Sequence, residues 1–469
     1  MYKLLTQYIK LLSDTHTPVS VYLKLRDKFP NSILLESSDY HSNENSFSYI
    51  CCEPIASIQV DKGIVEERYP DGSETNRELD GSFTVVDAVE DFKDKFELDD
   101  VPFKFVTNGL FGYINYEAVQ HFEDIEFNHS SDTSDKQTPD LQYAIYRYLI
   151  IFDHFKNELY IFEHSLDGEG KEPGRKIIQS LIENRNFASY TFESEEELRS
   201  NFTDEEFMAI VSEGVKHCKR GDVFQVVLSR EFQRKFKGDE FNVYRALRAV
   251  NPSPYLFYFD YGSFRLFGSS PEAQIVIKDG RAGIYPIAGT YPRSGDDQKD
   301  AQMAQELKDD PKEGSEHIML VDLARNDLSR NAKNVKVDTF SEIQYYSHVI
   351  HMVSKVTGEL EGTKGAFQIV ADTFPAGTLS GAPKYRAMEL IDQYENGPRG
   401  FYGGAIGYMG FNGDFNHAII IRSILSVNNT LIYQAGAGVV SESDEKKELQ
   451  EVNNKLGALN EAIERANSI

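Results

Sequence analysis

The stretch AIGYMGFNGDFNHAIIIRSILSV, residues 405–427, carries most of the information about the fold. Two runs of aliphatic, β-branched and aromatic residues flank the turn residues 412–414, and Arg422 interrupts the second run. Apolar runs of strand length that are joined by Gly, Asn and Asp are typical of antiparallel hairpins. The stretch therefore favours an antiparallel sheet over a regular alternation of parallel strands and helices.

Similar runs extend in both directions from this stretch. They cover residues 32–40, 47–60, 141–164, 223–236, 254–270, 274–280 and 431–440. Helical patterns intervene irregularly, at residues 204–222, 296–309, 312–324, 364–371, 383–394 and 444–466. Runs of strands with inserted helices predict an α+β fold, with a strand-rich two-layer β-sandwich core of antiparallel sheets and helices packed outside.

The chain of 469 residues is longer than the roughly 250–300 residues that one core usually supports. We predict a strand-rich N-terminal domain at 1–165, a polar connecting segment at 166–202 and a second domain at 203–469. Thr203 is expected to cap the helix that opens the second domain, because threonine hydroxyls accept hydrogen bonds from the first turn.

Charge and composition narrow the class of protein. The net charge of −26 argues against nucleic-acid binding, and it means that an anionic substrate needs local arginine, lysine, backbone N–H groups or a metal. No apolar run approaches the roughly 20 residues of a membrane span, and the N-terminus lacks the order of a signal peptide. Three cysteines form neither a disulfide framework nor a metal knuckle. These features predict a soluble, cytoplasmic protein.

Two helical segments place glutamates beside their apolar faces. In the C-terminal helix, for which Ser443 is a plausible N-cap, Glu448 and Glu451 share a narrow sector with Lys455, next to the leucine stripe. An earlier segment repeats the pattern with Glu313 and Glu316. Each pattern alone is common on solvated helices, but two cases beside apolar faces favour a hard cation. Magnesium suits glutamates that come without a Cys/His cluster better than zinc does.

Other polar residues lie within or next to the apolar strand-like runs. Arg422 lies within an apolar run, where a guanidinium needs an anion. Gly436 and Gly438 precede the last helix, and their backbone N–H groups are suited to cradle a carboxylate. Gln225 and His351 also lie in apolar strands, where each is equally explained as a satisfied core residue.

Taken together, these stretches resemble the chorismate-utilising enzymes, and within them anthranilate synthase component I. The matching stretches are GDVFQVVLSREF, GSSPEAQI, YPIAGTYPR, EGSEHIMLVDLARNDLS, YYSHVIHMVSKVTGEL, FPAGTLSGAPKYRAMELI, GPRGFYGGAIGY, AIIIRS and YQAGAGVVSESDEKKELQEVNNK. They cover nearly all of residues 203–466. The N-terminal third is similar mainly through LLESSD and GLFGYINYEAV.

The resemblance implies a role for each matching residue. It implies that Glu316 and Glu451 bind Mg²⁺, with Glu313 and Glu448 behind them, and that Glu272 is the general acid. Thr378 and His351 would lie beside the reacting ring, with Gln225 at the position that selects the nucleophile. The residues implied in holding the substrate carboxylates are Gly289, Thr290, Tyr402, Arg422, Gly436, Ala437, Gly438 and Lys455.

Two positions separate the reactions of this family. Relatives that add water carry a lysine base where this chain has Gln225, and glutamine is not basic enough to activate water. Relatives that make aminodeoxychorismate commonly carry a lysine where this chain has Ala288. The resemblance thus implies that chorismate and ammonia give anthranilate and pyruvate with Mg²⁺, in the first step of tryptophan biosynthesis. The alternatives are an aminodeoxychorismate synthase component I and a non-catalytic regulator that binds chorismate or tryptophan.

The resemblance also implies regulation and a partner. Glu36, Ser37, Pro254, Tyr255 and Leu256 resemble a pocket for feedback inhibition by tryptophan, although LLES is also explained as a plain strand end. No cysteine lies in a glycine-flanked nucleophile elbow. The ammonia is therefore expected from a separate glutamine amidotransferase subunit.

Overall fold

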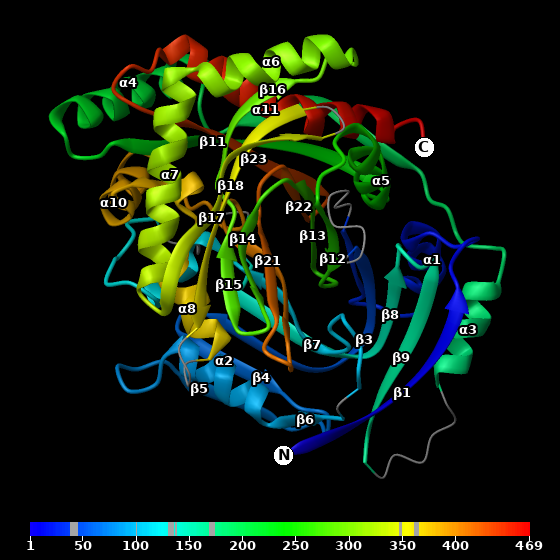
Figure 1. Ribbon diagram of the computed structural model, residues 1–469. Helices are drawn as coiled ribbons and strands as arrows, with labels where there is room; N and C mark the ends of the chain where they lie inside the picture. The colour runs from blue at the N-terminus through cyan, green and yellow to red at the C-terminus, as the bar shows by residue number, and fades with distance from the viewer. Residues whose placement is uncertain are drawn as a thin grey trace.

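A computed structural model describes the chain except for residues 38–45, 100, 130–135, 137, 168–173, 347–348 and 361–364, and it does not describe the side chain of Thr290. Strands form a curved core and helices lie around its outside (Figure 1). Within the described part, the pairing of β1 (Tyr2–Leu12) with β6 (Phe96–Leu98) is parallel and the other strand pairings are antiparallel. The predicted α+β fold with antiparallel sheets is confirmed.

One continuous path of paired strands runs through the molecule. In spatial order it comprises β10 (Phe192–Ser200), β11 (Gln225–Gly238), β23 (Thr430–Val439), β22 (Ser423–Val427), β13 (Phe264–Ser270), β12 (Tyr255–Asp260), β2 (Ile33–Ser37), β3 (Phe47–Asp61), β8 (Leu141–Asp153), β7 (Gly109–Ile114), β20 (Ala405–Gly410), β21 (Phe415–Ile419), β14 (Ala273–Lys278), β15 (Arg281–Ile284), β18 (Val349–Leu360) and β17 (Ala332–Tyr345). The strands that pair beside this path are β1, β4 (Ile64–Arg68), β5 (Glu74–Glu78), β6, β9 (Glu158–Leu166), β16 (Ile287–Pro292) and β19 (Gly381–Ala382).

The helices carry the apolar stripes that cover the outer faces. They are α1 (Pro18–Leu25), α2 (Val85–Asp94), the 3-10 helix η2 (Tyr116–His121), α3 (Gly174–Glu183), α4 (Asp204–Arg220), α5 (Phe241–Val250), α6 (Asp297–Asp309), α7 (Pro311–Ser329), α8 (Ala366–Thr373), α9 (Gly377–Ser380), α10 (Lys384–Tyr394) and α11 (Glu445–Ala466). In the described part of the chain, no helix combines the length and the apolar character that crossing a membrane requires.

Side-chain alternation along the strands produces the sandwich. On β8, Leu149 and Ile151 belong to a core cluster formed between strands of the two layers. Their neighbours Ile150 and Phe152 belong to a second cluster, which strands share with α4, α5 and α11. Successive strand residues point to opposite faces, so one strand contributes to both cores. A third cluster lies under α2, α7 and α8.

One local expectation differs from the structure. The N-cap of α11 is Asp444, whose carboxylate accepts from the Lys447 N–H, whereas the Ser443 hydroxyl accepts from the backbone of Val440. The two residues are adjacent and both are good cap formers, so sequence alone did not separate them. The acidic stretch expected as polar connection contains β10, an edge strand on β11. Thr203 does cap α4, with a complete capping box.

Strands from both ends of the chain pair directly. β2 pairs with β12, and β7 pairs with β20. The proposed domain boundaries at 165 and 203 stay a prediction. For the site, the important consequence is that β11 and β23 lie side by side, with Ser229 opposite Gly436 and Val227 opposite Gly438.

Candidate active site

A cavity of about 570 Å³ opens where β11 and β23 meet α7 and α11. It brings together nearly all the residues that the family resemblance assigns to catalysis, metal binding and substrate binding. Those that line it are Gln225, Glu272, Ala288, Gly289, Glu313, Glu316, His351, Thr378, Tyr402, Arg422, Gly436, Gly438, Glu448, Glu451 and Lys455. The side chain of Thr290 lies outside the described atoms. Ala437 does not line the cavity, because its side chain lies in the core on the opposite face of β23.

The position of the Gln225 side chain in the cavity depends on a glycine at position 438. A Cβ on Gly438 would lie 2.5 Å from Nε2 of Gln225, so only glycine leaves room for that amide. The amide uses this space to donate to Oε1 of Glu316 at 2.8 Å. The sequence GAG on β23 thus fixes the position of a side chain on β11, which in turn contacts α7.

Arg422 supplies a half-buried positive charge. It lies between β21 and β22 with a positive φ of 50°, which a non-glycine residue adopts rarely and at a cost. Its Nη1 lies 3.4 Å from Oδ1 of Asn251. Burial lowers the pKa of Arg422, with an opposing contribution from Glu272. A half-buried guanidinium held by a neutral amide is suited to bind an anion.

Lys455 and Tyr402 complete the polar wall. The Lys455 ammonium donates to the carbonyl of Gly436 at 2.9 Å and pairs with Glu451 at 2.7 Å. Tyr402 is almost fully buried, and burial is the main reason that its pKa rises. The backbone N–H of Gly436 donates to its hydroxyl, which lowers that pKa in part.

Glu272 has the protonation state of a general acid. Burial raises its pKa to about 8, while a hydrogen bond from Thr378 at 3.2 Å and the charge of Arg422 lower it in part. At neutral pH the carboxyl group therefore holds its proton, and Arg422 keeps its charge available for a ligand. A carboxylic acid with a pKa near the working pH is well suited to protonate a leaving group.

His351 is a neutral hydrogen-bonding residue. Its Nδ1 lies 2.9 Å from the carbonyl of Gly289, which only accepts, so Nδ1 carries the proton. Burial lowers the pKa of the imidazole to about 4. Gly289 has a φ of 65°, and a Cβ there would lie 2.4 Å from Cδ1 of Leu307. Position 289 therefore requires glycine both for its backbone angle and for its contact with Leu307.

Four glutamates face one another from α7 and α11. Burial, and then repulsion from Glu316, raise the pKa of Glu313. Burial also raises the pKa of Glu448, and Glu451 adds repulsion to it. Such repulsion marks a place where a cation would be stabilised. In the described residues no three or more such side chains are close enough to form a complete metal site. Mg²⁺ needs only one or two carboxylates when substrate oxygens and water supply the rest, so this donor set fits it.

Four polar residues that line the cavity are absent from the sequence-based set, namely Asn251, Lys312, Gln434 and Asn454. Gln434 precedes Gly436 and Gly438 at intervals of two residues on β23, so strand alternation places all three on one face. This alternation in the sequence could have identified Gln434 as a residue of the site. Asn251 follows α5 in a loop and has no comparable pattern.

The residues expected to bind an inhibitor also come together. Glu36 lies opposite Leu256, and Ser37 lies opposite Tyr255, where β2 pairs with β12, and Pro254 directly precedes that strand. Glu36 is buried and accepts from the hydroxyl of Tyr244 at 2.6 Å, and it pairs with Arg248 at 2.8 Å. Burial raises the pKa of Glu36, while Arg248 and Tyr244 lower it in part.

The fold and the cavity define a class of enzymes that bind an anionic substrate next to a cluster of carboxylates. Comparison with known families identifies that class, since residues 11–461 match the family described as chorismate binding enzyme. The chain belongs to the chorismate-binding enzyme family. It is accordingly a chorismate-utilising enzyme.

Similar proteins extend over the whole chain. It is 37% identical to anthranilate synthase component 1 of Aquifex aeolicus, over 99% of this chain and 96% of that protein. It is 38% identical to the protein of the same name from Neisseria meningitidis, over 96% and 93%. Among solved structures, anthranilate synthase component I from Streptococcus pneumoniae matches with a TM-score of 0.77 and 28% identity, covering 96% of this chain and 99% of that one.

A second solved structure shows how widely the fold is shared. The menaquinone-specific isochorismate synthase of Escherichia coli matches with a TM-score of 0.72 at 17% identity, over 98% and 94% of the two chains. At that identity the likeness concerns the fold alone. The reaction has to be argued from the residues in the cavity.

Proposed function

We propose that this chain is the large subunit of an anthranilate synthase, a cytoplasmic enzyme that converts chorismate and ammonia to anthranilate, pyruvate and water. This is the first step of tryptophan biosynthesis. The observation that carries the proposal is the amide of Gln225, which donates to Glu316 in the cavity floor. An amide is too weak a base to activate water, whereas ammonia is already nucleophilic. Ala288, in the cavity wall, supplies no amine for a covalent step.

The cavity residues have the chemistry that this reaction needs. Arg422 and Lys455, with the backbone near Gly436 and Gly438, would hold the two carboxylates of chorismate. Ammonia forms a bond to C2, the ring double bonds shift, and the C4–O bond breaks. Glu272 protonates the departing hydroxyl, which leaves as water, and the new ammonium group gives up one proton.

The second stage restores an aromatic ring. Loss of the C2 proton and of the enolpyruvyl group, which takes up a proton and leaves as pyruvate, gives anthranilate. In this scheme Thr378 orients Glu272 through its hydrogen bond, and neutral His351 lies near the 4-hydroxyl without carrying charge.

The four glutamates support a role for Mg²⁺. Glu316 and Glu451 would hold the ion, with Glu313 and Glu448 behind them. When bound, Mg²⁺ supplies positive charge for a carboxylate of the substrate. This would relieve the repulsion that raises the pKa values of Glu313 and Glu448.

The state of the cysteines supports ammonia supply by a separate glutamine amidotransferase subunit. Cys51 is buried, and burial raises the pKa of its thiol well above the usual value. Burial raises the thiol pKa of Cys218 to about 11. A nucleophilic cysteine requires a lowered pKa, so neither thiol is equipped to hydrolyse glutamine.

The pairing of β2 with β12 supports tryptophan as an inhibitor. It places Glu36, Ser37, Tyr255 and Leu256 within one patch. Buried Glu36 provides a carboxylate for the amino group of an amino acid.

One assay tests the proposed reaction. The purified chain is mixed with chorismate, MgCl₂ and an ammonium salt at alkaline pH, where free ammonia is populated. The expected result is blue anthranilate fluorescence with an equal amount of pyruvate. A product that keeps the enolpyruvyl group, identified by mass, would indicate an aminodeoxychorismate synthase instead. Chorismate binding by calorimetry without any turnover would indicate a regulator.

A further inference from the structure

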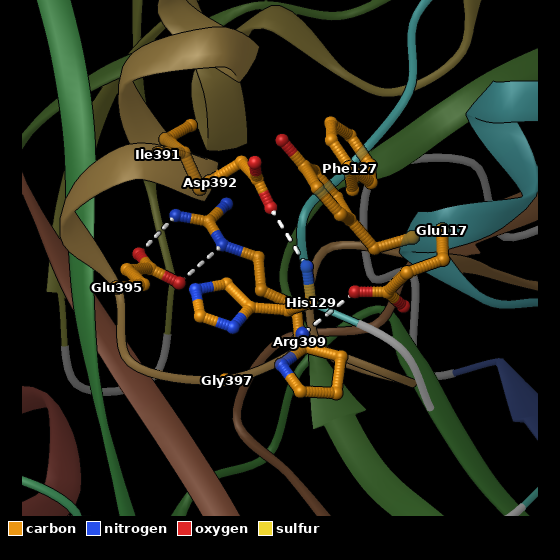
Figure 2. Close-up of a pocket in the computed structure, with 10 residues that line it drawn as sticks. Glu117, Phe127, His129, Ile391, Asp392, Glu395, Gly397 and Arg399 are labelled. Atoms are coloured by element: carbon orange, nitrogen blue, oxygen red, sulfur yellow. Dashed lines mark hydrogen bonds and ion pairs between the residues drawn. The ribbon is translucent and has the colours of Figure 1, made fainter. Parts of the chain in front are cut away.

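A carboxylate of the N-terminal motif GLFGYINYEAV holds a turn that belongs to the C-terminal part of the chain. Glu117 lies in η2 and is buried, and each of its two oxygens accepts a backbone N–H group. Oε1 accepts from Arg399 at 2.7 Å, as Figure 2 shows, and Oε2 accepts from Gly400 at 2.8 Å. One side chain thereby fixes two successive peptide groups that lie more than 280 residues away in sequence.

The side chain of Arg399 is fixed as firmly as its backbone. Its guanidinium pairs with the carboxylate of Glu395 at 2.6 and 2.9 Å (Figure 2). It also donates to the carbonyls of Val227 and Leu379, two residues that line the cavity. A buried charged network whose members are hydrogen-bonded holds them in one arrangement. The start of the turn is therefore rigid.

The turn continues into the cavity wall. Tyr402, which lines the cavity, lies three residues after Arg399, and its ring centre is 5.6 Å from the guanidinium carbon. The two glycines that follow Tyr402 exchange backbone hydrogen bonds with Ile420, at 3.0 and 2.8 Å. Ile420 lies two residues before Arg422. The position of this one turn thus affects both Tyr402 and the segment that carries Arg422.

Glu117 itself does not face the substrate. It is not among the described residues that line the cavity of about 570 Å³. The pocket that it does line has a volume of about 10 Å³, which is room for about one water molecule. Glu117 can therefore act on the cavity only through the turn that it holds.

The charge of Glu117 matters for this hold. Burial raises the pKa of Glu117 to about 7, while the charge of Lys136 and the backbone N–H groups lower it in part. Lys136 also pairs with Glu231 at 2.6 Å. The other charged or titratable side chains that line the same pocket are those of His129, Asp392, Glu395 and Arg399. Protonation of Glu117 would turn one of its acceptor oxygens into a donor that faces an N–H group.

We propose that ionised Glu117 is a positioning residue for chorismate binding, because it holds residues 399–404 in the arrangement that places Tyr402 and Arg422 in the cavity wall. The inference rests on the proposed function and deepens it, since it adds a residue of the N-terminal third to the groups that determine substrate affinity. Chorismate affinity then depends on the ionisation of a side chain that does not touch chorismate.

The test is the Kd for chorismate of the wild type and of Glu117→Gln, measured by calorimetry with MgCl₂ and without ammonia at pH 8 and at pH 6. The glutamine amide keeps one acceptor and presents a donor to the other N–H group. At pH 8 the variant is expected to have a Kd about 3- to 10-fold higher than the wild type. At pH 6 the ratio of the two Kd values should approach one, because the wild-type carboxyl group is then protonated.

The ratio isolates Glu117, since Glu272 titrates in both proteins and its effect on Kd cancels. A general loss of packing would raise Kd by the same factor at both pH values. Such a constant ratio, or equal Kd values at pH 8, would overturn the inference. Glu126→Gln, at an exposed glutamate nine residues further along, is the matched control and should leave Kd unchanged at both pH values.

Two further results have a defined meaning. If thermal melting shows that Glu117→Gln does not fold, Glu117→Asp replaces it. Its shorter carboxylate cannot reach both N–H groups, and the ratio of Kd values must again fall from pH 8 to pH 6. A wild-type chain that binds chorismate but forms no anthranilate would refute the proposed reaction, and this binding test would still decide the role of Glu117.

Discussion

The amide nitrogen of Gln225 lies 2.8 Å from Oε1 of Glu316, and this contact connects the cavity floor on β11 to α7. Gln225→Lys would put a base and a positive charge at the same place. We expect anthranilate formation to fall by at least about 10-fold, since the lysine displaces ammonia and pairs with Glu316. Chromatography should detect isochorismate, the product of water addition. Unchanged anthranilate formation would show that Gln225 does not select the nucleophile.

Replacing Glu272 by glutamine should remove the general acid without changing the shape of the site. We expect kcat to fall by about 10²- to 10⁴-fold, the usual contribution of a positioned acid. In the wild type at saturating ammonia, kcat should decrease above pH about 8, where Glu272 loses its proton. A stopped assay across pH 6–10 checks both statements. An alkaline decrease that persists in a slow Glu272→Gln enzyme would assign it to another group.

The effect of Glu272→Gln on stability should depend on pH. The folded-state pKa of about 8 lies above the ordinary value of 4.5, so the folded wild type keeps a proton that the unfolded chain has lost. Wild-type stability therefore falls as pH rises from about 5 to 8, and the glutamine variant lacks this loss. Between those pH values the Tm of the variant is expected to rise progressively relative to the Tm of the wild type. A constant difference would mean that burial of Glu272 does not shift its titration.

Two glycine-to-alanine variants separate close packing from helix propensity. At Gly438 a Cβ would lie 2.5 Å from Nε2 of Gln225, so Gly438→Ala should displace that amide and lower kcat/KM by about 10-fold or more. At Gly457, within α11, the same Cβ would meet no atom within 4 Å. Gly457→Ala should raise the free energy of unfolding by about 0.5–1 kcal/mol and leave activity unchanged. Urea melts and initial rates of both proteins decide this prediction.

The effect of Glu313→Gln on thermal stability should depend on whether Mg²⁺ is present. Repulsion and burial destabilise the ionised Glu313 carboxylate in the metal-free protein, so the variant should have the higher Tm in EDTA. With MgCl₂ and chorismate the wild type should gain more Tm, because it retains all four carboxylates. Glu196→Gln, on the exposed strand β10, serves as the control and should show neither effect. If Mg²⁺ shifts the Tm of Glu313→Gln as much as that of the wild type, the carboxylate has no part in metal binding.

Ser37→Phe tests the proposed inhibitor site. Ser37 lies opposite Tyr255 and next to buried Glu36, so a large side chain there should fill the space that tryptophan would occupy. We expect the tryptophan concentration for half inhibition to rise at least about 10-fold, while the uninhibited rate stays within about twofold. Inhibition curves of the two proteins provide the measurement. Equal curves would remove the regulatory assignment from this pair of strands.

The sequence by itself determined the features that arise locally. Thr203 caps α4 as expected, since an N-cap needs only its own side chain and the next turn. The alternating strand runs predicted the sandwich, because alternation alone decides that Leu149 and Ile150 face different cores. Gln225, Glu272 and Arg422, which the family resemblance singled out, line one cavity, and their roles stay a prediction.

Only the tertiary structure decided which neighbours each side chain meets. It turned Ala437 into the core and Gln434 towards the cavity, although both lie in the same short motif. It placed Glu36 opposite Leu256, which lies nearly half the chain away in sequence, and it raised the pKa of Glu272 to about 8. Strand register and desolvation depend on groups that are distant in sequence, so local periodicity does not contain them.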